Sequence, residues 1–269
     1  MEYNLNKRKV AYCAEGLKAF GSDKILLNQA IDLTSGKLWS KNGFTISQFL
    51  NEQAFEKFEK ETKRLLFFLW RKAGISVPDG FQLEQYHTLT SDRNSHLAAV
   101  DQTKLLSVSD FPIPILEIES RISEICETPL IAKNPFDQQS IFHFRIVRPH
   151  SNDNNPLHRD VWLKDYANCI NLYIPIAGSN DLSSLSIIPG SHCWRESRIE
   201  RTQEGALLDG VQYNVPAVTD IRGDYEIVRP NPKRNEVLVF SPYLIHGGAI
   251  NLNPNQTRIS VELRLWKKN

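Results

Sequence analysis

Several features that would narrow the function at once are missing from these 269 residues. The cysteines, Cys13, Cys126, Cys169 and Cys193, are scattered and form no C-x-x-C pair, which excludes a zinc knuckle by spacing. A disulfide framework is not expected in a chain of this size with so few cysteines. We therefore expect reduced thiols and a cytoplasmic protein.

An excess of charge and a long apolar segment are also missing. Lys plus Arg number 32 against 31 for Asp plus Glu, so no global field would concentrate nucleic acid or an anionic membrane. The longest apolar run, 65–70, is far shorter than the roughly 20 residues of a membrane span. Residues 1–9 are polar, which is not typical of a signal peptide. The expected partner is a small molecule, not nucleic acid or a membrane.

The first half of the chain, 1–138, is predicted to be mainly helical support and loops. Apolar residues recur with a period near 3.6 across 44–73, which predicts an amphipathic helix. Residues 115–126 predict a second one after a proline-rich connector. The polar, weakly periodic stretch 80–110 is predicted to be a loop or lid.

From about residue 139 the pattern changes to short strands separated by Gly, Pro and Asn turns. The predicted strands are 141–147, 168–175, 185–188, 236–240 and 258–266. Helices followed by strands indicate an α+β fold, in which the strands of 139–266 form a sandwich or closed barrel. We expect one domain over 1–269, with the charged segment 194–230 as a possible lid over the barrel mouth.

A His-x-Asp triplet supplies the first chemical signal. His158 and Asp160 can point the same way from a strand, while Arg159 points elsewhere. His246 follows 88 residues after His158, in a glycine-rich turn. Two imidazoles and one carboxylate form the facial triad of non-haem Fe(II) oxygenases. A His-x-Asp alone is more often a hydrogen-bonded surface pair, so the prediction depends on what accompanies it.

The accompanying signal is an arginine twelve residues after His246. On the strand 258–266, Arg258, Ser260, Glu262 and Arg264 share one face, which either meets solvent or lines a polar cavity. A guanidinium binds a carboxylate through two parallel hydrogen bonds, and Ser260 would add a third donor. The pair therefore predicts an anchor for 2-oxoglutarate, whose keto-acid end can chelate iron. The alternative is an exposed Arg258 paired with Glu262.

Candidate substrate-binding residues are Arg145, Trp162 and Glu262. Arg145 and Glu262 would make the cavity polar, which favours a small polar substrate such as an amino acid or amino-sugar. Trp162 could form a wall over the iron or be a core aromatic. His143 is a further candidate that could equally be a satisfied core histidine.

These motifs in order, with Pro189-Gly190-Ser191-His192 between them, resemble the phytanoyl-CoA dioxygenase-like family over roughly 139–266. The resemblance implies a double-stranded β-helix (jelly-roll or cupin-like) and an enzyme that uses Fe(II), 2-oxoglutarate and O2. It assigns iron to His158, Asp160 and His246, 2-oxoglutarate to Arg258 with Ser260, and a structural role to Ser191 and His192.

The sequence departs from the family pattern at Gly248, where members often carry a Ser or Thr that helps bind the co-substrate. Asn171 or Tyr173 is expected to share that role. Related halogenases lack the carboxylate ligand, so Asp160 favours hydroxylation, with release of succinate and CO2. Desaturation, epimerisation and ring closure stay open. The alternatives are a cupin-like isomerase or binding barrel that does not use 2-oxoglutarate, and an oxygenase acting on a macromolecule.

Overall fold

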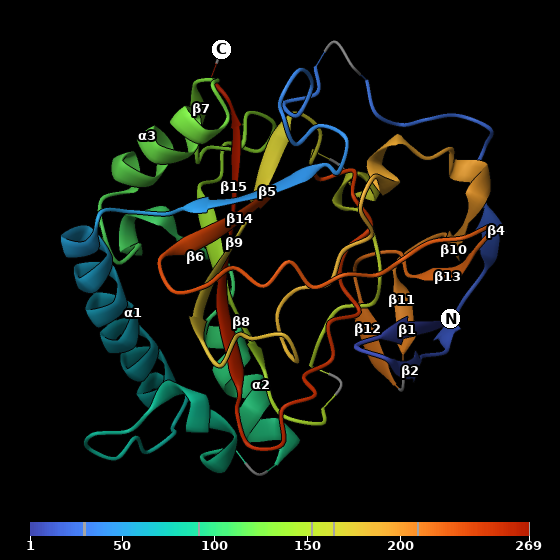
Figure 1. Cartoon of the computed structure of the whole chain (residues 1–269). Coiled ribbons are helices and arrows are strands. Elements are labelled where there is room, and N and C mark those ends of the chain that lie inside the picture. The colour runs from blue at the N-terminus through green and yellow to red at the C-terminus, as the bar shows by residue number, and fades with distance from the viewer. Residues whose placement is uncertain (29–30, 91, 152, 164, 209, 269) are drawn as a thin grey trace.

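One antiparallel sheet organises the molecule (Figure 1). The computed structural model describes residues 1–28, 31–90, 92–151, 153–163, 165–208 and 210–268. The sheet has the order β5-β14-β9-β15-β8-β6, and β7 also pairs with β15. Its strands are β5 (Phe44–Gln48), β6 (Leu106–Ser107), β7 (Leu130–Ile131), β8 (Ile141–Val147), β9 (Cys169–Ala177), β14 (Glu236–Phe240) and β15 (Arg258–Lys267).

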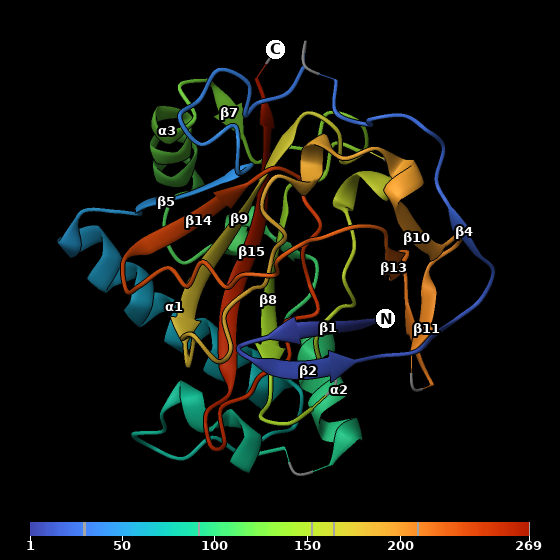
Figure 2. The same cartoon turned by 45° about the vertical axis from the view of Figure 1, so that its right-hand side comes forward.

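Helices cover one face of this sheet (Figures 1 and 2). They are α1 (Glu52–Lys72), α2 (Arg93–Gln102) and α3 (Ile115–Ile125), with 3-10 turns η1 (Leu83–Thr88) and η2 (Val108–Asp110) between them. Asn51 caps α1 by accepting a hydrogen bond from the Ala54 amide at 2.9 Å. The chain then leaves the helix at Gly74, which adopts a positive φ of 84°.

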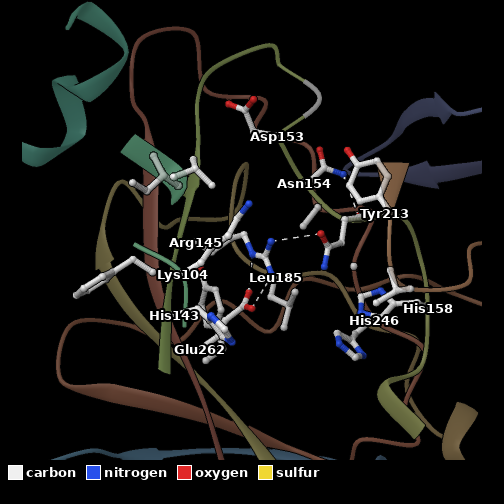
Figure 3. Close-up of a pocket in the computed structure, with 18 of the residues that line it drawn as sticks. Lys104, His143, Arg145, Asp153, Asn154, His158, Leu185, Tyr213, His246 and Glu262 are labelled. Carbon is white, nitrogen blue, oxygen red and sulfur yellow. Dashed lines mark hydrogen bonds and ion pairs between the residues drawn. The ribbon is translucent and has the colours of Figure 1, made fainter. Parts of the chain in front are cut away.

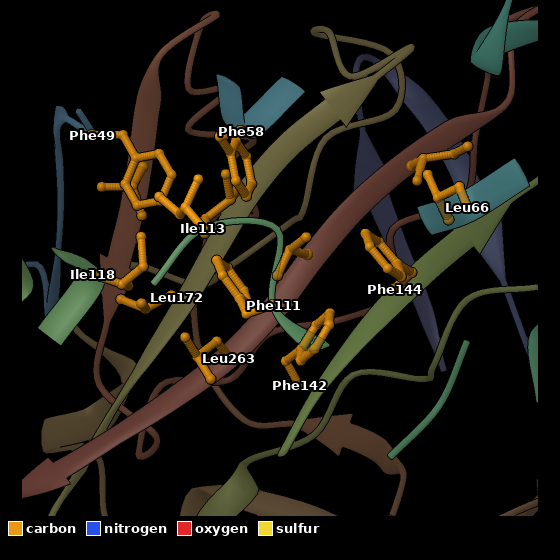
Figure 4. Close-up of a cluster of buried hydrophobic side chains, with 14 of the residues drawn as sticks. Phe49, Phe58, Leu66, Phe111, Ile113, Ile118, Phe142, Phe144, Leu172 and Leu263 are labelled. Atoms are coloured by element: carbon orange, nitrogen blue, oxygen red, sulfur yellow. The ribbon is translucent and has the colours of Figure 1, made fainter. Parts of the chain in front are cut away.

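The main core lies between the sheet and these helices (Figure 4). Because side chains alternate along a strand, β15 sends Ile259, Val261, Leu263 and Leu265 into this core. Phe142 and Phe111 lie in the same core and meet each other edge to face, with ring centroids 4.9 Å apart. The opposite face of β15 carries the polar residues Arg258, Ser260, Glu262 and Arg264.

Two three-stranded sheets lie beside the main sheet and combine distant parts of the chain. One has the order β13 (Val218–Ile221), β10 (Ile199–Thr202), β4 (Lys18–Phe20), and the other β12 (Val211–Tyr213), β11 (Ala206–Leu208), β3 (Ala14–Glu15). A hairpin of β1 (Glu2–Leu5) and β2 (Arg8–Ala11) completes the N-terminal part. Figures 1 and 2 show these N-terminal strands next to the 199–221 strands.

The α+β class is confirmed, and most predicted strands are found. β8 and β14 have the predicted bounds, and β9, β15 and α3 differ by one or two residues. Among the described residues, no helix is long and apolar enough to cross a membrane.

Four predictions about secondary structure are wrong. Residues 44–48 form β5 instead of the first turns of a helix, because they pair with β14 along their whole length. Residues 185–188 contain a single bridge residue, Ile187, which meets Val228 and His246. Residues 80–110 hold helical turns and a short strand instead of a loop, and the described residues of 194–230, where no strand was predicted, hold four strands. In each segment, pairing or packing with distant residues overrides weak local propensity. The lid role of 80–110 and 194–230 stays a prediction.

Replacing Leu263 by Ala is expected to lower the free energy of unfolding by about 3 kcal/mol, because the side chain is buried where strand and helices meet. Leu116→Ala on α3 is the control, because that side chain is 72% exposed and should cost less than about 0.5 kcal/mol. Denaturant titration measures both. Equal losses in the two variants would contradict the packing described here.

Candidate metal centre

His158, Asp160 and His246 meet in the structure. Their potential ligand atoms all lie within 4.8 Å of one another, and all three residues are buried. Asp160 Oδ1 lies 3.4 Å from His158 Nε2 and 3.6 Å from His246 Nε2. His158 and His246 are neighbours because their backbones form an antiparallel bridge, with amide-to-carbonyl distances of 2.9 Å in both directions.

Backbone carbonyls fix the orientation of both imidazoles. His158 Nδ1 lies 2.7 Å from the Pro156 carbonyl, and His246 Nδ1 lies 2.9 Å from the Leu244 carbonyl. An Nδ1–H that donates to a carbonyl leaves the Nε2 lone pair free for a metal. Gly247 permits this approach, because a Cβ there would lie 2.3 Å from the Pro156 carbonyl oxygen.

The two oxygens of Asp160 have different surroundings. Oδ2 accepts hydrogen bonds from Asn171 Nδ2 at 2.9 Å and from Arg264 Nε and Nη2 at 3.0 and 2.8 Å. Oδ1 faces the two imidazoles. Burial raises the pKa of Asp160, but Arg264 and the two histidines outweigh it and hold the pKa well below its ordinary value. Asp160 is therefore an ionised carboxylate with one oxygen directed to the candidate site.

His246 is ready to act as a ligand at neutral pH. Burial, helped by the neighbouring His158, lowers the pKa of His246 to about 4. The ring is therefore neutral near pH 7, as a metal ligand must be.

Arg159 points away from its neighbours in the triplet, as predicted. Its guanidinium is fully buried and contacts Glu196 Oε1 and the Ser191 carbonyl. Trp162 donates to Glu196 Oε2 at 2.8 Å and is not among the residues that line the main cavity. The expectation that Trp162 forms a wall over the metal is therefore not met, because Glu196 holds its indole on the side of Arg159. No local pattern around Glu196 indicates this contact.

The Pro-Gly-Ser-His turn supports the candidate site without entering it. Ser191 Oγ accepts a hydrogen bond from the Ile245 amide at 2.8 Å, directly before His246. His192 Nε2 lies 2.8 Å from the Ser40 carbonyl, and its ring packs against Gly43. The structural reading of Ser191 and His192 agrees with these contacts.

The candidate metal centre opens into a cavity of about 460 Å³ (Figure 3). The polar face of β15 lines it through Arg258, Glu262 and Arg264, which agrees with the cavity alternative for this strand. Figure 3 shows the two imidazoles at one end of the cavity, and His143, Arg145 and Glu262 together at another.

Arg258 is a buried cation whose hydrogen bonds are incomplete. It is 2% exposed, yet its Nε and Nη1 have no hydrogen-bond partner among the described residues. The hydroxyl of Ser260 is buried and unpartnered as well. Leaving such groups unpaired costs about 1–3 kcal/mol each, so a bound acceptor is expected here. The alternative of an Arg258–Glu262 ion pair is not found, because Glu262 pairs with Arg145.

Asn171 and Tyr173 support the site through other residues. Asn171 binds the Asp160 carboxylate, and its own Oδ1 has no partner in the described part of the chain. The Tyr173 ring lies 5.8 Å from the Arg258 guanidinium carbon, and its hydroxyl lies 2.7 Å from Ser179 Oγ. Tyr173 therefore presents its ring, and not its hydroxyl, to the candidate anchor.

Gly248 is explained by Tyr3 from the N-terminal hairpin. The Tyr3 hydroxyl donates to the Gly248 carbonyl at 2.7 Å. A Cβ on Gly248 would lie 2.7 Å from that hydroxyl, and the φ of this glycine is +60°. A Ser or Thr does not fit at this position. The contact of Gly248 with Tyr3, which lies 245 positions away in the sequence, therefore explains why this position carries no Ser or Thr.

Arg145 and Glu262 form an ion pair on the cavity wall. Arg145 donates to the two Glu262 oxygens at 3.2 and 2.9 Å and to Asn155 Oδ1 at 3.3 Å. Burial raises the pKa of Glu262, but Arg145 outweighs it and holds the pKa at about 2. His143 lines the same wall and accepts a hydrogen bond from the Leu105 amide at Nδ1 (2.9 Å), so one nitrogen is satisfied.

The residues present fit both groups that the sequence predicted. Two imidazoles with free Nε2 atoms and one carboxylate oxygen form a three-ligand set that suits Fe(II) and leaves further coordination positions open. The orphaned Arg258 nitrogens suit a carboxylate in the same cavity. The unpartnered Ser260 hydroxyl lies two residues along the same strand, although Ser260 is not among the residues that line the cavity.

The model of the phytanoyl-CoA dioxygenase (PhyH) family matches residues 39–260. The chain belongs to this family. Family membership and the three-ligand set together indicate Fe(II) and 2-oxoglutarate as cofactors. Among curated proteins, none matches the sequence.

Solved structures of similar fold share little sequence with the PhyH-family chain. AviO1 from Streptomyces viridochromogenes Tue57 is 14% identical, with a TM-score of 0.52 over 91% of this chain and 97% of AviO1. The epimerase SnoN, solved in complex with Fe3+, alpha ketoglutarate and nogalamycin RO, is 10% identical, with a TM-score of 0.49 over 85% of this chain and 80% of SnoN. The likeness to AviO1 concerns the fold alone.

Asn171→Ala is expected to weaken metal binding about tenfold, because Asp160 loses one of the donors that fix its orientation. Tyr173→Phe is the control on the same face of β9, because its hydroxyl contacts Ser179 and no other described residue. Anaerobic titration with Fe(II) measures both dissociation constants. Equal affinities in the two variants would show that the Asn171 contact does not orient the ligand.

The stability of the protein is expected to fall between pH 6.5 and 4 because of His143. Burial, followed by the charge of Arg264, lowers the pKa of His143 from 6.5 to about 4. The unfolded chain therefore binds a proton that the folded state excludes in this window, and stability is full only above it.

His143→Gln removes this titration, so its stability should decline less steeply than that of the wild type. The slopes should differ by at most about 1.4 kcal/mol per pH unit. Urea unfolding at a series of pH values measures them. Parallel profiles would contradict a buried neutral His143.

Proposed function

We propose that this PhyH-family protein is an Fe(II)- and 2-oxoglutarate-dependent dioxygenase that hydroxylates a small polar metabolite. The observation that carries the proposal is the orphaned Arg258 guanidinium in the cavity that also holds the His158, Asp160 and His246 cluster. An isomerase or binding barrel that does not use 2-oxoglutarate has no need of a buried, unpaired arginine at this position.

Each residue has a separate task in this proposal. His158, Asp160 and His246 hold iron through Nε2, Oδ1 and Nε2. Arg258 and Ser260 bind the distal carboxylate of 2-oxoglutarate. When bound, iron, 2-oxoglutarate and O2 supply the oxidising chemistry that inserts one oxygen atom into a substrate C–H bond and releases succinate and CO2. Asp160 favours hydroxylation over halogenation because the carboxylate ligand is present.

The substrate is proposed to bind along the wall formed by Arg145 and Glu262. Their ion pair lines the cavity and leaves the metal end open. His143 adds an imidazole to this wall. Trp162 has no part in the proposed binding site.

The fold is proposed to be a double-stranded β-helix within one domain. The main sheet would supply one half of it. The bridges of Ile187 with Val228 and His246, and of His158 with His246, would mark the other half. The two small sheets would then be additions to this framework.

Anaerobic addition of Fe(II) and 2-oxoglutarate is expected to produce the visible metal-to-ligand charge-transfer band of a chelated 2-oxoglutarate. Arg258→Ala should raise the dissociation constant for 2-oxoglutarate about 100-fold, because two charge-assisted hydrogen bonds are lost. Arg258→Lys keeps the charge without the planar fork and should lie between wild type and Ala.

Arg195→Ala serves as the control, because this arginine is on the surface and pairs with Asp23. It should leave the band and the affinity unchanged. Absence of the band in the wild type would defeat the co-substrate assignment. Unchanged 2-oxoglutarate affinity in Arg258→Ala would defeat the assignment of the anchor.

A further inference from the structure

The charges that line the cavity do not balance. Counting Lys and Arg against Asp and Glu, the described lining residues include five cations and three carboxylates. The cations are Arg93, Lys104, Arg145, Arg258 and Arg264, and the carboxylates are Asp153, Asp160 and Glu262. Binding of Fe(II) with the 2-oxoglutarate dianion adds +2 and −2, so the positive excess persists in the loaded site.

Most of these charged groups form ion pairs or are exposed to water. Arg145 is matched by Glu262 at 2.9 Å. The Asp153 carboxylate forms an ion pair at 2.9 Å with Arg148, which is not itself a lining residue of the cavity. Lys104 is 46% exposed, and Arg93 is exposed as well, so water solvates both. Arg258 would be neutralised by the distal carboxylate of the co-substrate.

Arg264 remains. Its one carboxylate partner among the described residues, Asp160, is the group that the proposed iron would also share. The Arg264 side chain is 19% exposed, so water solvates the guanidinium only in part. Once iron also draws on Asp160, this one carboxylate would have to balance both the metal and a partly buried guanidinium, and a bound anion would supply the missing negative charge.

One of the three guanidinium nitrogens of Arg264 has no hydrogen-bond partner among the described residues. Nε and Nη2 both donate to Asp160 Oδ2, and the Tyr166 ring lies 4.6 Å from the guanidinium carbon. Nη1 has no hydrogen-bond partner among the described residues. Arg264 and Tyr166 both line the cavity, so Nη1 can donate to a bound molecule next to the metal end.

Apolar side chains lie at the rim of the same cavity. Leu97 and Val100 on α2 and the nearby Leu105 line it, and Leu97 and Leu105 are 40% and 66% exposed. A fully hydrophilic molecule would gain nothing from these residues. A molecule with an apolar part would bury them.

We propose that the substrate is a monocarboxylate with an apolar part, whose carboxylate binds Arg264 Nη1 and whose apolar part packs on Leu97, Val100 and Leu105. This inference rests on the proposed function and narrows its substrate class. A single buried excess charge fits a monoanion better than a phosphate dianion. Arg264 thereby both orients the Asp160 ligand and selects the substrate.

Two probes of nearly the same shape test the proposal, one with a charged carboxylate and one with a neutral amide in its place. 3-Phenylpropionate and 3-phenylpropionamide are titrated by calorimetry into the anaerobic wild-type protein with Fe(II) and saturating 2-oxoglutarate, and the charge-transfer band is recorded in parallel. The carboxylate should bind at least about tenfold more tightly than the amide, with the band retained. Equal affinities, or no binding of either probe, would overturn the proposal.

Variants locate the anion. Arg264→Gln should reduce the preference for the carboxylate to below about threefold. Lys104→Gln is the matched control, a cation of the same cavity that water solvates, and should change the preference by less than about twofold. If Arg264→Gln loses the metal, Arg264→Lys keeps the charge and should retain a weakened preference. An unchanged preference in the Arg264 variants would overturn the assignment.

The band separates this inference from the proposed function. Absence of the band in the wild type would defeat the proposed function itself. A normal band with equal affinity for the two probes would defeat the substrate class alone. Loss of the band as 3-phenylpropionate is added would mean that the probe displaces 2-oxoglutarate from Arg258, which also overturns the Arg264 assignment.

Discussion

The pairing of β15 between β8 and β9 is the constraint on which the candidate site depends. Ile259, Val261, Leu263 and Leu265 are fixed in the core, so the register of this strand cannot slip without exposing them. The alternating residues are thereby fixed on the opposite face. The same apolar packing that stabilises the fold thus sets the positions of Arg258 and Glu262, to which the proposed function assigns binding roles, and of Arg264.

The candidate metal centre adds loop residues to this rigid strand. His158 and His246 come from segments that pair through one bridge, and Asp160 begins a 3-10 turn, η3 (Asp160–Trp162). Two kinds of contact hold these ligand residues in place where no regular strand does so. Arg264 and Asn171 hold the carboxylate from the main sheet, while the turn at Ser191 holds the backbone before His246 and the side chain of Arg159. Arg159 and Glu196 form a buried ion pair, which fixes one arrangement of these loops because Arg159 without Glu196 would be an unpaired buried charge.

The candidate site was predictable from the sequence where its residues follow the period of a strand. Alternation on 258–266 identified the polar face. The spacing of His158 and Asp160 identified two members of the cluster, but the expected strand is not found there, because His158 forms a single bridge and Asp160 begins a 3-10 turn. The contacts of Glu196 and Tyr3 were not predictable, because each joins residues far apart in the chain with no local pattern. Trp162 was misplaced for the same reason, since Glu196 determines where its indole lies.

The sequence by itself determined the α+β class, the strands β8, β9, β14 and β15 of the main sheet and the residue types of the candidate metal centre. These follow from periodicity and from the chemistry of side chains, which are local properties. Tertiary structure decided that residues 44–48 form a strand, that 194–230 contains strands paired with the N-terminus, and that Gly248 has no room for a side chain. It also decided which charges are paired, because the distance between two side chains depends on the fold and not on their separation in sequence.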